Sequence, residues 1–248
     1  MKPLTIILLS LILSVTKAAA EEVKVAIAAN FTDVARILAE RFEQQTGHTT
    51  RISYGSTGKL YSQIEHGAPF EVFLAADRAR PQKAENEGLA VNGSGFVYAR
   101  GKLVLWSLKE SLFERGERYL NAGEFRHLAL ANPKTAPYGL AAQQVMQHLG
   151  ILEQTRPRLV RGDSIAQTFQ FVATGNADAG FVALAQIKAW PGKNGSLWEI
   201  PESYYAPIDQ AAVVLNKGRD NPAAQAFIEF LKSDEAKQVI QSYGYGVE

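Results

Sequence analysis

The chain has 248 residues, 46% of them hydrophobic and 21% charged, which is the composition of a soluble globular protein with room for one or two ordinary cores. Its formal net charge of +1 gives no support to a nucleic-acid partner. The absence of cysteine excludes disulfides and a lipidated cysteine.

The first twenty residues have the pattern of a secretory signal. Lys2 precedes the apolar run "LTIILLSLILSV" at 4–15, and "KAAAEE" offers small residues for cleavage. The run is too short for a comfortable membrane span. We therefore expect a cleavable signal peptide over 1–20 and a periplasmic protein. Its removal would leave 24 basic residues against 25 acidic ones.

The next part of the chain alternates predicted strands and helices. Apolar runs bounded by turn residues predict strands at 23–30, 51–55 and 70–77. Between them, apolar residues spaced by four predict two helices, which end near Gly47 and Gly67. The second helix begins just after "SYGSTGKL" at 53–60.

The same alternation continues to the end of the chain. The predicted strands are 127–133, 158–164, 179–185 and 211–215, and the predicted helices are 137–150, 165–175, 221–233 and 234–244. This order predicts an α/β protein with mostly parallel sheets. Extended segments at 94–107 and 200–210 predict that the chain crosses twice between two lobes. We expect lobe I to hold 21–100 and 206–248, and lobe II to hold 101–205.

The glycine-rich "SYGSTGKL" stretch is a candidate anion site. A nucleotide-binding P-loop needs glycine five positions before Gly58 and serine or threonine after Lys59, but Ser53 and Leu60 stand there. The remaining signal is Ser56 and Thr57 at a helix start, where unpaired N–H groups attract anions. A simple capped helix is the alternative. The helical pattern turns Lys59 toward solvent, so we expect it to matter least.

Three further helix starts resemble this turn. Asn30 ends the first predicted strand, Tyr138 follows Pro137 at a helix start, and Ser164 precedes Ile165 at another. In parallel α/β sheets, strand ends and helix starts share one edge, so these turns should lie close together. Helix dipoles and neutral donors would then form an anion site without arginine or lysine. The alternative for Asn30 is a helix N-cap, with Asp33 as a weak capping box.

Other chemistry has little support in the sequence. The four histidines have no metal-ligand spacing, and no G-x-S-x-G nucleophile elbow occurs. The adjacent pair Tyr204 and Tyr205 raises the alternative of a ferric-ion binder, but an extended strand would point these two side chains in opposite directions. We therefore expect no enzyme and no cofactor, although a secreted enzyme of similar fold stays an alternative.

Five stretches together resemble the periplasmic molybdate-binding proteins of ABC importers. They are "AIAANFTDVARILAERFEQQTG", "YGSTGKLYSQIEHGAPFEVFLAAD", "ANPKTAPYG", "GNADAGFVA" and "FIEFLKSDEAKQVIQSYGYG". The block "QIEHGAPFEVFLAAD" is the most specific, and the resemblance covers essentially the whole chain after the signal. It implies a two-lobed, type II-like periplasmic binding fold that closes on its ligand.

The resemblance also implies a ligand and its contacts. Family members hold a tetrahedral oxyanion, molybdate or tungstate, through hydroxyl or amide groups and backbone N–H groups, without direct ligands to the metal. By position these contacts fall on Asn30, Ser56, Thr57, Tyr138 and the backbone of Ile165. Relatives often have serine at the position of Asn30 and a small residue at that of Tyr138, and some have a ligand-contacting tyrosine where this chain has Ala183.

The expected partners follow from the same family. A monomer would deliver the oxyanion to a membrane permease with a cytoplasmic ATPase. Molybdate and tungstate are acceptor-only dianions, whereas hydrogenphosphate carries a proton that needs an acceptor. Sulfate is also an acceptor-only dianion, and only cavity size would exclude it. Whether Asp33 or Asp163 faces the cleft is open at this stage.

Overall fold

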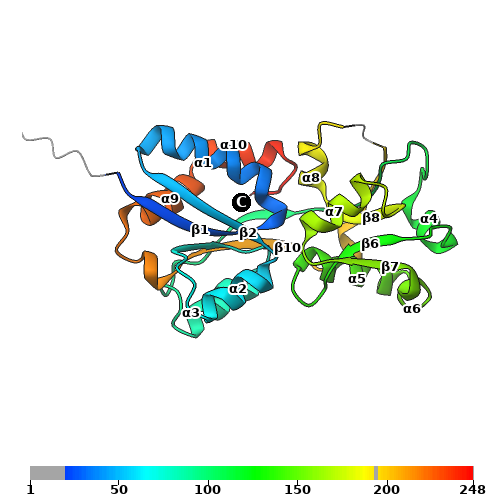
Figure 1. The fold of residues 1–248 in the computed structure, drawn as a ribbon, viewed down its shortest axis with the longest axis horizontal. Coiled ribbons are helices and arrows are strands. Elements are labelled where there is room, and N and C mark those ends of the chain that lie inside the picture. The colour runs from blue at the N-terminus through cyan, green and yellow to red at the C-terminus, as the bar shows by residue number, and fades with distance from the viewer. Residues whose placement is uncertain (1–19, 193–194, 248) are drawn as a thin grey trace, which may run out of the picture.

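The computed structural model describes residues 20–192 and 195–247, so the predicted signal peptide lies almost wholly outside the described residues. Two β-sheets lie side by side along the long axis, and each has helices on both of its faces (Figure 1). We call the first sheet with its helices the first lobe, and the second sheet with its helices the second lobe. The predicted α/β class with two lobes is confirmed.

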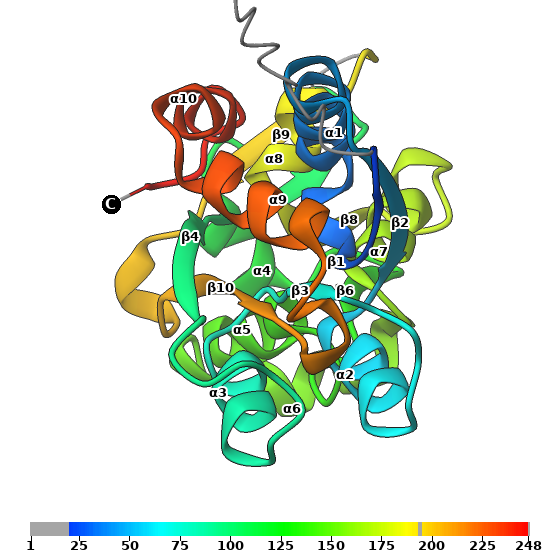
Figure 2. The ribbon, with the colours of Figure 1, turned by 90° about the vertical axis from the view of Figure 1, so that its left-hand side faces the viewer.

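The sheet of the first lobe has five strands. Their order is β2 (Thr49–Gly55), β1 (Glu22–Ala28), β3 (Val72–Leu74), β10 (Ile208–Val214) and β4 (Phe96–Gly101). One face packs against α1 (Thr32–Thr46), α9 (Pro222–Lys232) and α10 (Asp234–Ser242). The other packs against α2 (Thr57–Glu65) and α3 (Ala79–Asn86), as the view along the long axis shows (Figure 2).

The second lobe has a sheet of the same size. Its strand order is β7 (Leu159–Gly162), β6 (Leu128–Ala131), β8 (Ala179–Ala183), β5 (Leu103–Ser107) and β9 (Ser196–Glu199). One face packs against α4 (Gly116–Ala122), α5 (Pro137–His148) and α6 (Leu152–Thr155). The other packs against α7 (Ile165–Ala173) and α8 (Leu184–Ala189). Short 3-10 turns lie at Ala29–Phe31, Arg156–Arg158, Glu202–Tyr204 and Asn216–Gly218.

The prediction of mostly parallel sheets is wrong in part. In the first lobe β1 runs parallel to β2 and β3, but β10 runs antiparallel to β3 and β4. In the second lobe β6 runs parallel to β7 and β8, but β5 runs antiparallel to β8 and β9. The antiparallel pairings involve β4, β5, β9 and β10, the strands next to the two crossings. A chain that returns from the other lobe enters its sheet from the opposite end.

The junction between the lobes lies where the chain passes from one sheet to the other, which it does twice. β4 ends at Gly101 and β5 begins at Leu103, so only Lys102 separates strands of different sheets. The return crossing lies between β9 and β10, within the segment predicted to be extended. Within the described ranges, none of the helices has the length and apolar character that crossing a membrane requires.

Candidate anion-binding site

All five residues predicted for an anion site line one small cavity. The cavity holds about 200 Å³ of empty space, its opening included. The lining residues come from both lobes: Ala28, Ala29, Asn30, Gly55, Ser56, Thr57, Ala76, Ala136, Pro137, Tyr138 and Ile165. The part of the cavity that the centre of a water-sized sphere can occupy measures only about 10 Å³, whereas pockets for drug-sized ligands measure about 300–1,000 Å³. The size of this cavity therefore suits a small ion better than a larger organic molecule.

The cavity lies where four helix starts meet. The 3-10 turn at Ala29–Phe31 leads into α1, and α2 begins at Thr57, both in the first lobe. In the second lobe, α5 begins at Pro137 and α7 begins at Ile165. N–H groups of the first turn have no partner within their own helix, and the helix dipole makes this end positive. The predicted convergence of two helix starts from each lobe is thus found in the structure.

Ser56 and Thr57 provide two buried hydroxyl groups at the start of α2. Ser56 is the N-cap residue but its side chain makes no capping bond, and its buried Oγ has no partner among the described residues. The Thr57 Oγ1 accepts a hydrogen bond from the Ala76 N–H at 3.0 Å. This bond leaves the Thr57 hydroxyl proton for another acceptor. A buried hydroxyl without a partner, on the wall of a cavity, points to a ligand acceptor.

Asn30 does not cap a helix, so the alternative interpretation of this residue as a helix N-cap is wrong. β1 ends at Ala28, and Asn30 lies in the 3-10 turn before α1 with no side-chain cap. Its Nδ2 donates to the Gln210 Oε1 at 2.8 Å and to the Tyr245 Oη at 3.1 Å. These two bonds use both protons of the side-chain amide. For a ligand, the donor that remains at Asn30 is its backbone N–H.

Tyr138 also turns its side chain to a protein partner. It is buried in α5, and its hydroxyl accepts a hydrogen bond from the Gln210 Nε2 at 3.2 Å. Burial raises the pKa of Tyr138 well above its ordinary value, so the phenol stays neutral. Ile165 is the first residue of α7, and Ser164 caps that helix by accepting from the Gln167 N–H at 3.3 Å, as predicted. Both Tyr138 and Ile165 can offer a backbone N–H to the cavity.

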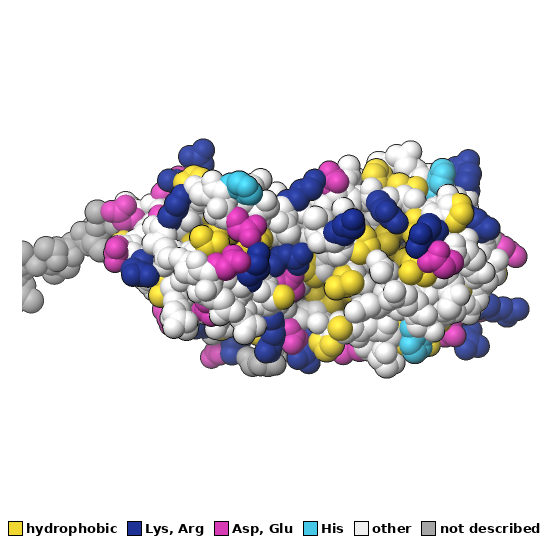
Figure 3. Space-filling model, turned by 90° about the horizontal axis from the view of Figure 1, so that it is seen from below, with side chains coloured by type: hydrophobic (Ala, Val, Ile, Leu, Met, Phe, Trp, Pro, Cys, Tyr) yellow, Lys and Arg dark blue, Asp and Glu magenta, His cyan; other side chains and the backbone are white. Residues whose placement is uncertain are grey.

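No acidic or basic side chain belongs to the described residues that line the cavity. Asp33 lines a neighbouring cavity between the lobes, and Asp163 is bound to Lys59. On the face seen from below, Asp and Glu side chains lie among the Lys and Arg side chains (Figure 3). Because no charged side chain is among the described residues of the lining, the cavity offers only neutral donors. Such a lining suits an anion that brings no proton of its own.

Lys59 is exposed, as predicted, but its side chain also forms an ion pair that the sequence did not predict. Its Nζ lies 2.7 Å from the Asp163 Oδ2, so the pair links α2 to the turn before α7 across the lobes. A backbone bond from Gly58 N–H to the Thr135 oxygen, at 2.8 Å, crosses at the same place. Arg80 adds a bond to the Lys134 oxygen at 3.2 Å. These contacts make the structure a closed arrangement of the two lobes.

The Lys59–Asp163 pair should nevertheless contribute little to affinity. The two side chains are 51% and 71% exposed, and exposed pairs are worth about 0–1 kcal/mol. Lys59→Ala should therefore weaken ligand binding by no more than about fivefold, and less at high salt. Calorimetry at two salt concentrations would measure this, with Asp163→Asn as the matched partner variant. A loss well above tenfold in Lys59→Ala alone would contradict the surface-pair interpretation.

The two tyrosines of the ferric-ion alternative lie elsewhere. The Tyr204 hydroxyl donates to Glu117 at 3.1 Å, and its ring stacks on His148 with centroids 4.0 Å apart. The Tyr205 hydroxyl accepts from the Leu103 N–H at 3.1 Å. Neither residue lines the cavity. Among the described residues, no group of three or more His, Cys, Asp or Glu side chains could hold a metal ion.

Comparisons with known proteins agree with this geometry. Residues 23–246 match the family model described as bacterial extracellular solute-binding protein. The chain is 55% identical to the molybdate-binding protein ModA of Azotobacter vinelandii, with 93% of this chain and 92% of the relative covered. It is 49% identical to ModA of Rhodobacter capsulatus, with 93% and 90% covered.

A solved structure extends the comparison to the fold. The periplasmic molybdate-binding protein of Azotobacter vinelandii superposes with a TM-score of 0.87 and 43% sequence identity. The match covers 91% of this chain and 99% of that one. The similarity therefore includes both lobes and the junction between them.

Proposed function

The chain belongs to the bacterial extracellular solute-binding proteins, and from this premise we propose that it captures molybdate in the periplasm and delivers it to the permease of an ABC importer. One observation carries the proposal: a small cavity, lined by neutral donors, at four helix starts from two closed lobes. Its relatives in Azotobacter vinelandii and Rhodobacter capsulatus are molybdate-binding proteins, which supports the choice of oxyanion. The family is one of solute binders, not of enzymes.

The proposed donors follow from which polar groups are already occupied. Ser56 Oγ has no partner in the described part of the chain, and Thr57 Oγ1 keeps its proton, so both hydroxyls can donate to the oxyanion. Asn30 and Tyr138 have their side chains bonded to Gln210, so we assign their backbone N–H groups to the ligand, together with that of Ile165. Molybdate would be bound through its oxygens, with no side chain bonded to the metal.

The chemistry of this lining selects among oxyanions. Hydrogenphosphate would bring a proton with no carboxylate to accept it, and an unpaired buried donor is costly. Tungstate has the charge and shape of molybdate, so we expect it to bind as well. Sulfate would have to be rejected by size. We further propose a monomer that needs no cofactor. Its first lobe would be lobe I, at 21–100 and 206–248, and its second lobe would be lobe II, at 101–205, except that Gly101 ends β4 of the first lobe.

A ligand titration tests the proposal. Tryptophan fluorescence or calorimetry would measure the affinity of the purified protein for molybdate, tungstate, sulfate and phosphate. We expect molybdate and tungstate to bind far more tightly than the other two. Tighter binding of sulfate or phosphate would overturn the assignment, and a visible absorption band on adding ferric ion would favour the tyrosinate alternative.

Thr57→Ala should weaken molybdate binding by about 10- to 150-fold. A hydrogen bond to a charged group is worth about 1.5–3 kcal/mol, and this variant removes one donor. It also leaves the Ala76 N–H without its buried partner, so the ligand-free protein should lose about 1–3 kcal/mol of stability.

Ser56→Ala is the matched control, because its hydroxyl has no protein partner among the described residues. It should lower affinity while the free energy of unfolding of the ligand-free protein stays the same. Calorimetry and urea unfolding of both variants separate the two effects. Unchanged affinity in both variants would remove the hydroxyls from the proposed donor set.

A further inference from the structure

Gln210 is fully buried, and both the oxygen and the nitrogen of its side-chain amide form hydrogen bonds. Its Oε1 accepts from the Asn30 Nδ2 at 2.8 Å and from the Tyr98 hydroxyl at 3.0 Å. Its Nε2 donates to the Tyr138 hydroxyl at 3.2 Å. Asn30, Tyr98 and Gln210 belong to the first lobe, but Tyr138 belongs to α5 of the second. One glutamine therefore joins two residues of the anion cavity from opposite lobes.

The local backbone aims this glutamine at the junction of the lobes. The register between β10 and β4 shifts between Gln210 and Ala211, and such bulges redirect a side chain. Gly101, at the end of β4, leaves the space that Tyr138 enters. A Cβ at Gly101 would lie 2.0 Å from the Tyr138 Oη and 2.7 Å from the Gln210 Nε2. A side chain at position 101 would exclude the Tyr138 hydroxyl from this place.

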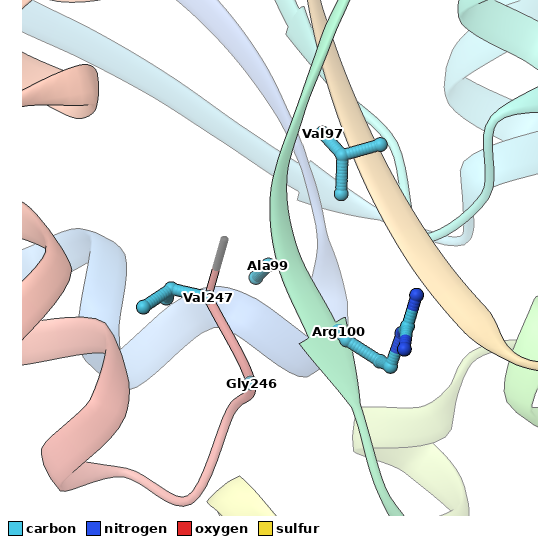
Figure 4. A pocket seen from close by; sticks show the side chains of 5 residues that line it. All are labelled: Val97, Ala99, Arg100, Gly246 and Val247. Carbon is cyan, nitrogen blue, oxygen red and sulfur yellow. The ribbon is translucent and has the colours of Figure 1, made fainter.

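Contacts within the first lobe hold Asn30 in place without help from the second lobe. The Tyr245 hydroxyl donates to the Asn30 backbone oxygen at 2.8 Å and accepts from its Nδ2. The next residue, Gly246, exchanges two backbone bonds with Arg100 of β4, at 2.7 and 2.9 Å. Gly246 and Val247 lie beside Ala99 of that strand (Figure 4). Asn30 thus helps to hold Gln210 in place, and the Gln210 Nε2 bonds to the Tyr138 hydroxyl.

We infer that the Tyr138–Gln210 hydrogen bond is a lobe-closure contact, and that Gln210 is a positioning residue for the oxyanion site. Tyr138 contacts both lobes: its hydroxyl bonds to Gln210 of the first lobe, while the residue itself lines the cavity in the first turn of α5, where backbone N–H groups lack a partner within the helix. When the lobes close, the bond fixes the start of α5 against the ligand. The inference rests on the proposed function, because it assumes that an oxyanion occupies this cavity.

The bond should act on ligand release. Both partners would be hydrated in an open form, so the bond should be worth about a two- to tenfold change in affinity. A contact made only after closure should slow dissociation and leave the association rate almost unchanged. Tyr138→Phe should therefore raise the molybdate release rate two- to tenfold in stopped-flow fluorescence. A merely structural hydroxyl would instead lower the unfolding temperature of the ligand-free protein and leave release unchanged.

A double-mutant cycle tests the pairing with Gln210. Tyr138→Phe should weaken molybdate binding two- to tenfold in the wild-type background and by less in a Gln210→Met background, where the bond between the Tyr138 and Tyr245 hydroxyls remains. Equal losses in both backgrounds would overturn the inference, because the hydroxyl would then act independently of Gln210. Tyr119→Phe is the matched control: this second-lobe tyrosine is also buried, and its hydroxyl has no partner among the described residues. It should bind as the wild type does.

Gly101→Ala provides a second test should Gln210→Met fail to fold. Its methyl group would occupy the place of the Tyr138 hydroxyl, so molybdate affinity should fall more than about tenfold. Wild-type affinity in Gly101→Ala would overturn the inference. If the wild-type protein binds sulfate or phosphate instead of molybdate, the proposed ligand is wrong but the inference about Gln210 is not refuted. The same double-mutant cycle, run with the oxyanion that does bind, would then decide the role of Gln210.

Discussion

Gly58→Leu should lower molybdate affinity by about 100-fold while both lobes stay folded. The Cβ of any residue here would lie 3.0 Å from the Thr135 Cα and 3.1 Å from the Thr135 oxygen, which belong to the other lobe. Gly58 N–H also donates to that oxygen at 2.8 Å. A leucine side chain would hold the lobes apart at this contact. A binding-competent state reduced to about 1% of the population lowers apparent affinity by the same factor.

The measurement combines calorimetry with small-angle scattering. Gly58→Leu should keep the larger radius of gyration of the open form when molybdate is added, whereas the wild type should contract. Ser62→Leu is the matched control, because Ser62 lies on the exposed side of the same helix, α2. It should bind and close normally. Normal affinity in Gly58→Leu would show that binding does not require this contact between the lobes.

Phe31→Ala should reduce both stability and affinity. Phe31 is fully buried in the turn that carries Asn30, and its ring meets Tyr98 and Tyr245 edge-on, with centroids 5.0 and 5.3 Å away. Removing a buried phenylalanine ring costs about 3–5 kcal/mol of stability. The two tyrosines that lose this support bond to Gln210 and Asn30. We therefore expect affinity to fall by about tenfold, the worth of one weakened contact.

Phe42→Ala is the control that separates the effect of lost core packing from an effect on the anion site. Phe42 is equally buried but lies near the far end of α1, where its ring packs against Phe227 and Phe230. It should lose about the same 3–5 kcal/mol in urea unfolding. Under conditions where both variants are folded, molybdate affinity should fall in Phe31→Ala and remain normal in Phe42→Ala. Equal affinities would limit the role of Phe31 to stability.

Local signals in the sequence were sufficient to predict most of the fold. The buried stripe of α1 is read from Val34, Leu38 and Phe42, and Gly47 ends that helix with a φ of 75°. The rule that helix starts share one edge of a sheet brought Asn30, Ser56 and Thr57 together. By contrast, the predicted strand 179–185 takes in Leu184 and Ala185, the first two residues of α8, because apolar residues run without a break from β8 into that helix.

Long-range partners account for what the sequence could not predict. The side chain of Asn30 meets Gln210 and Tyr245, 180 and 215 residues away along the chain. Lys59 meets Asp163, 104 residues away. Each pairing depends on how two complete lobes meet, and periodicity and capping patterns carry no information about that. The sequence therefore indicated which residues lie at the cavity, but not which of their atoms are free to bind.

The neutral lining has a consequence for how the proposed cargo would leave. The described residues around the cavity include no lysine or arginine, so no ion pair to the oxyanion has to be broken. The donors are shared between the lobes, at α2 on one side and at α5 and α7 on the other. Separating the lobes would remove part of the donor set in one movement, and water would replace it. Unloading at a permease would then require only mechanical work on the junction, with no proton transfer and no change of pH.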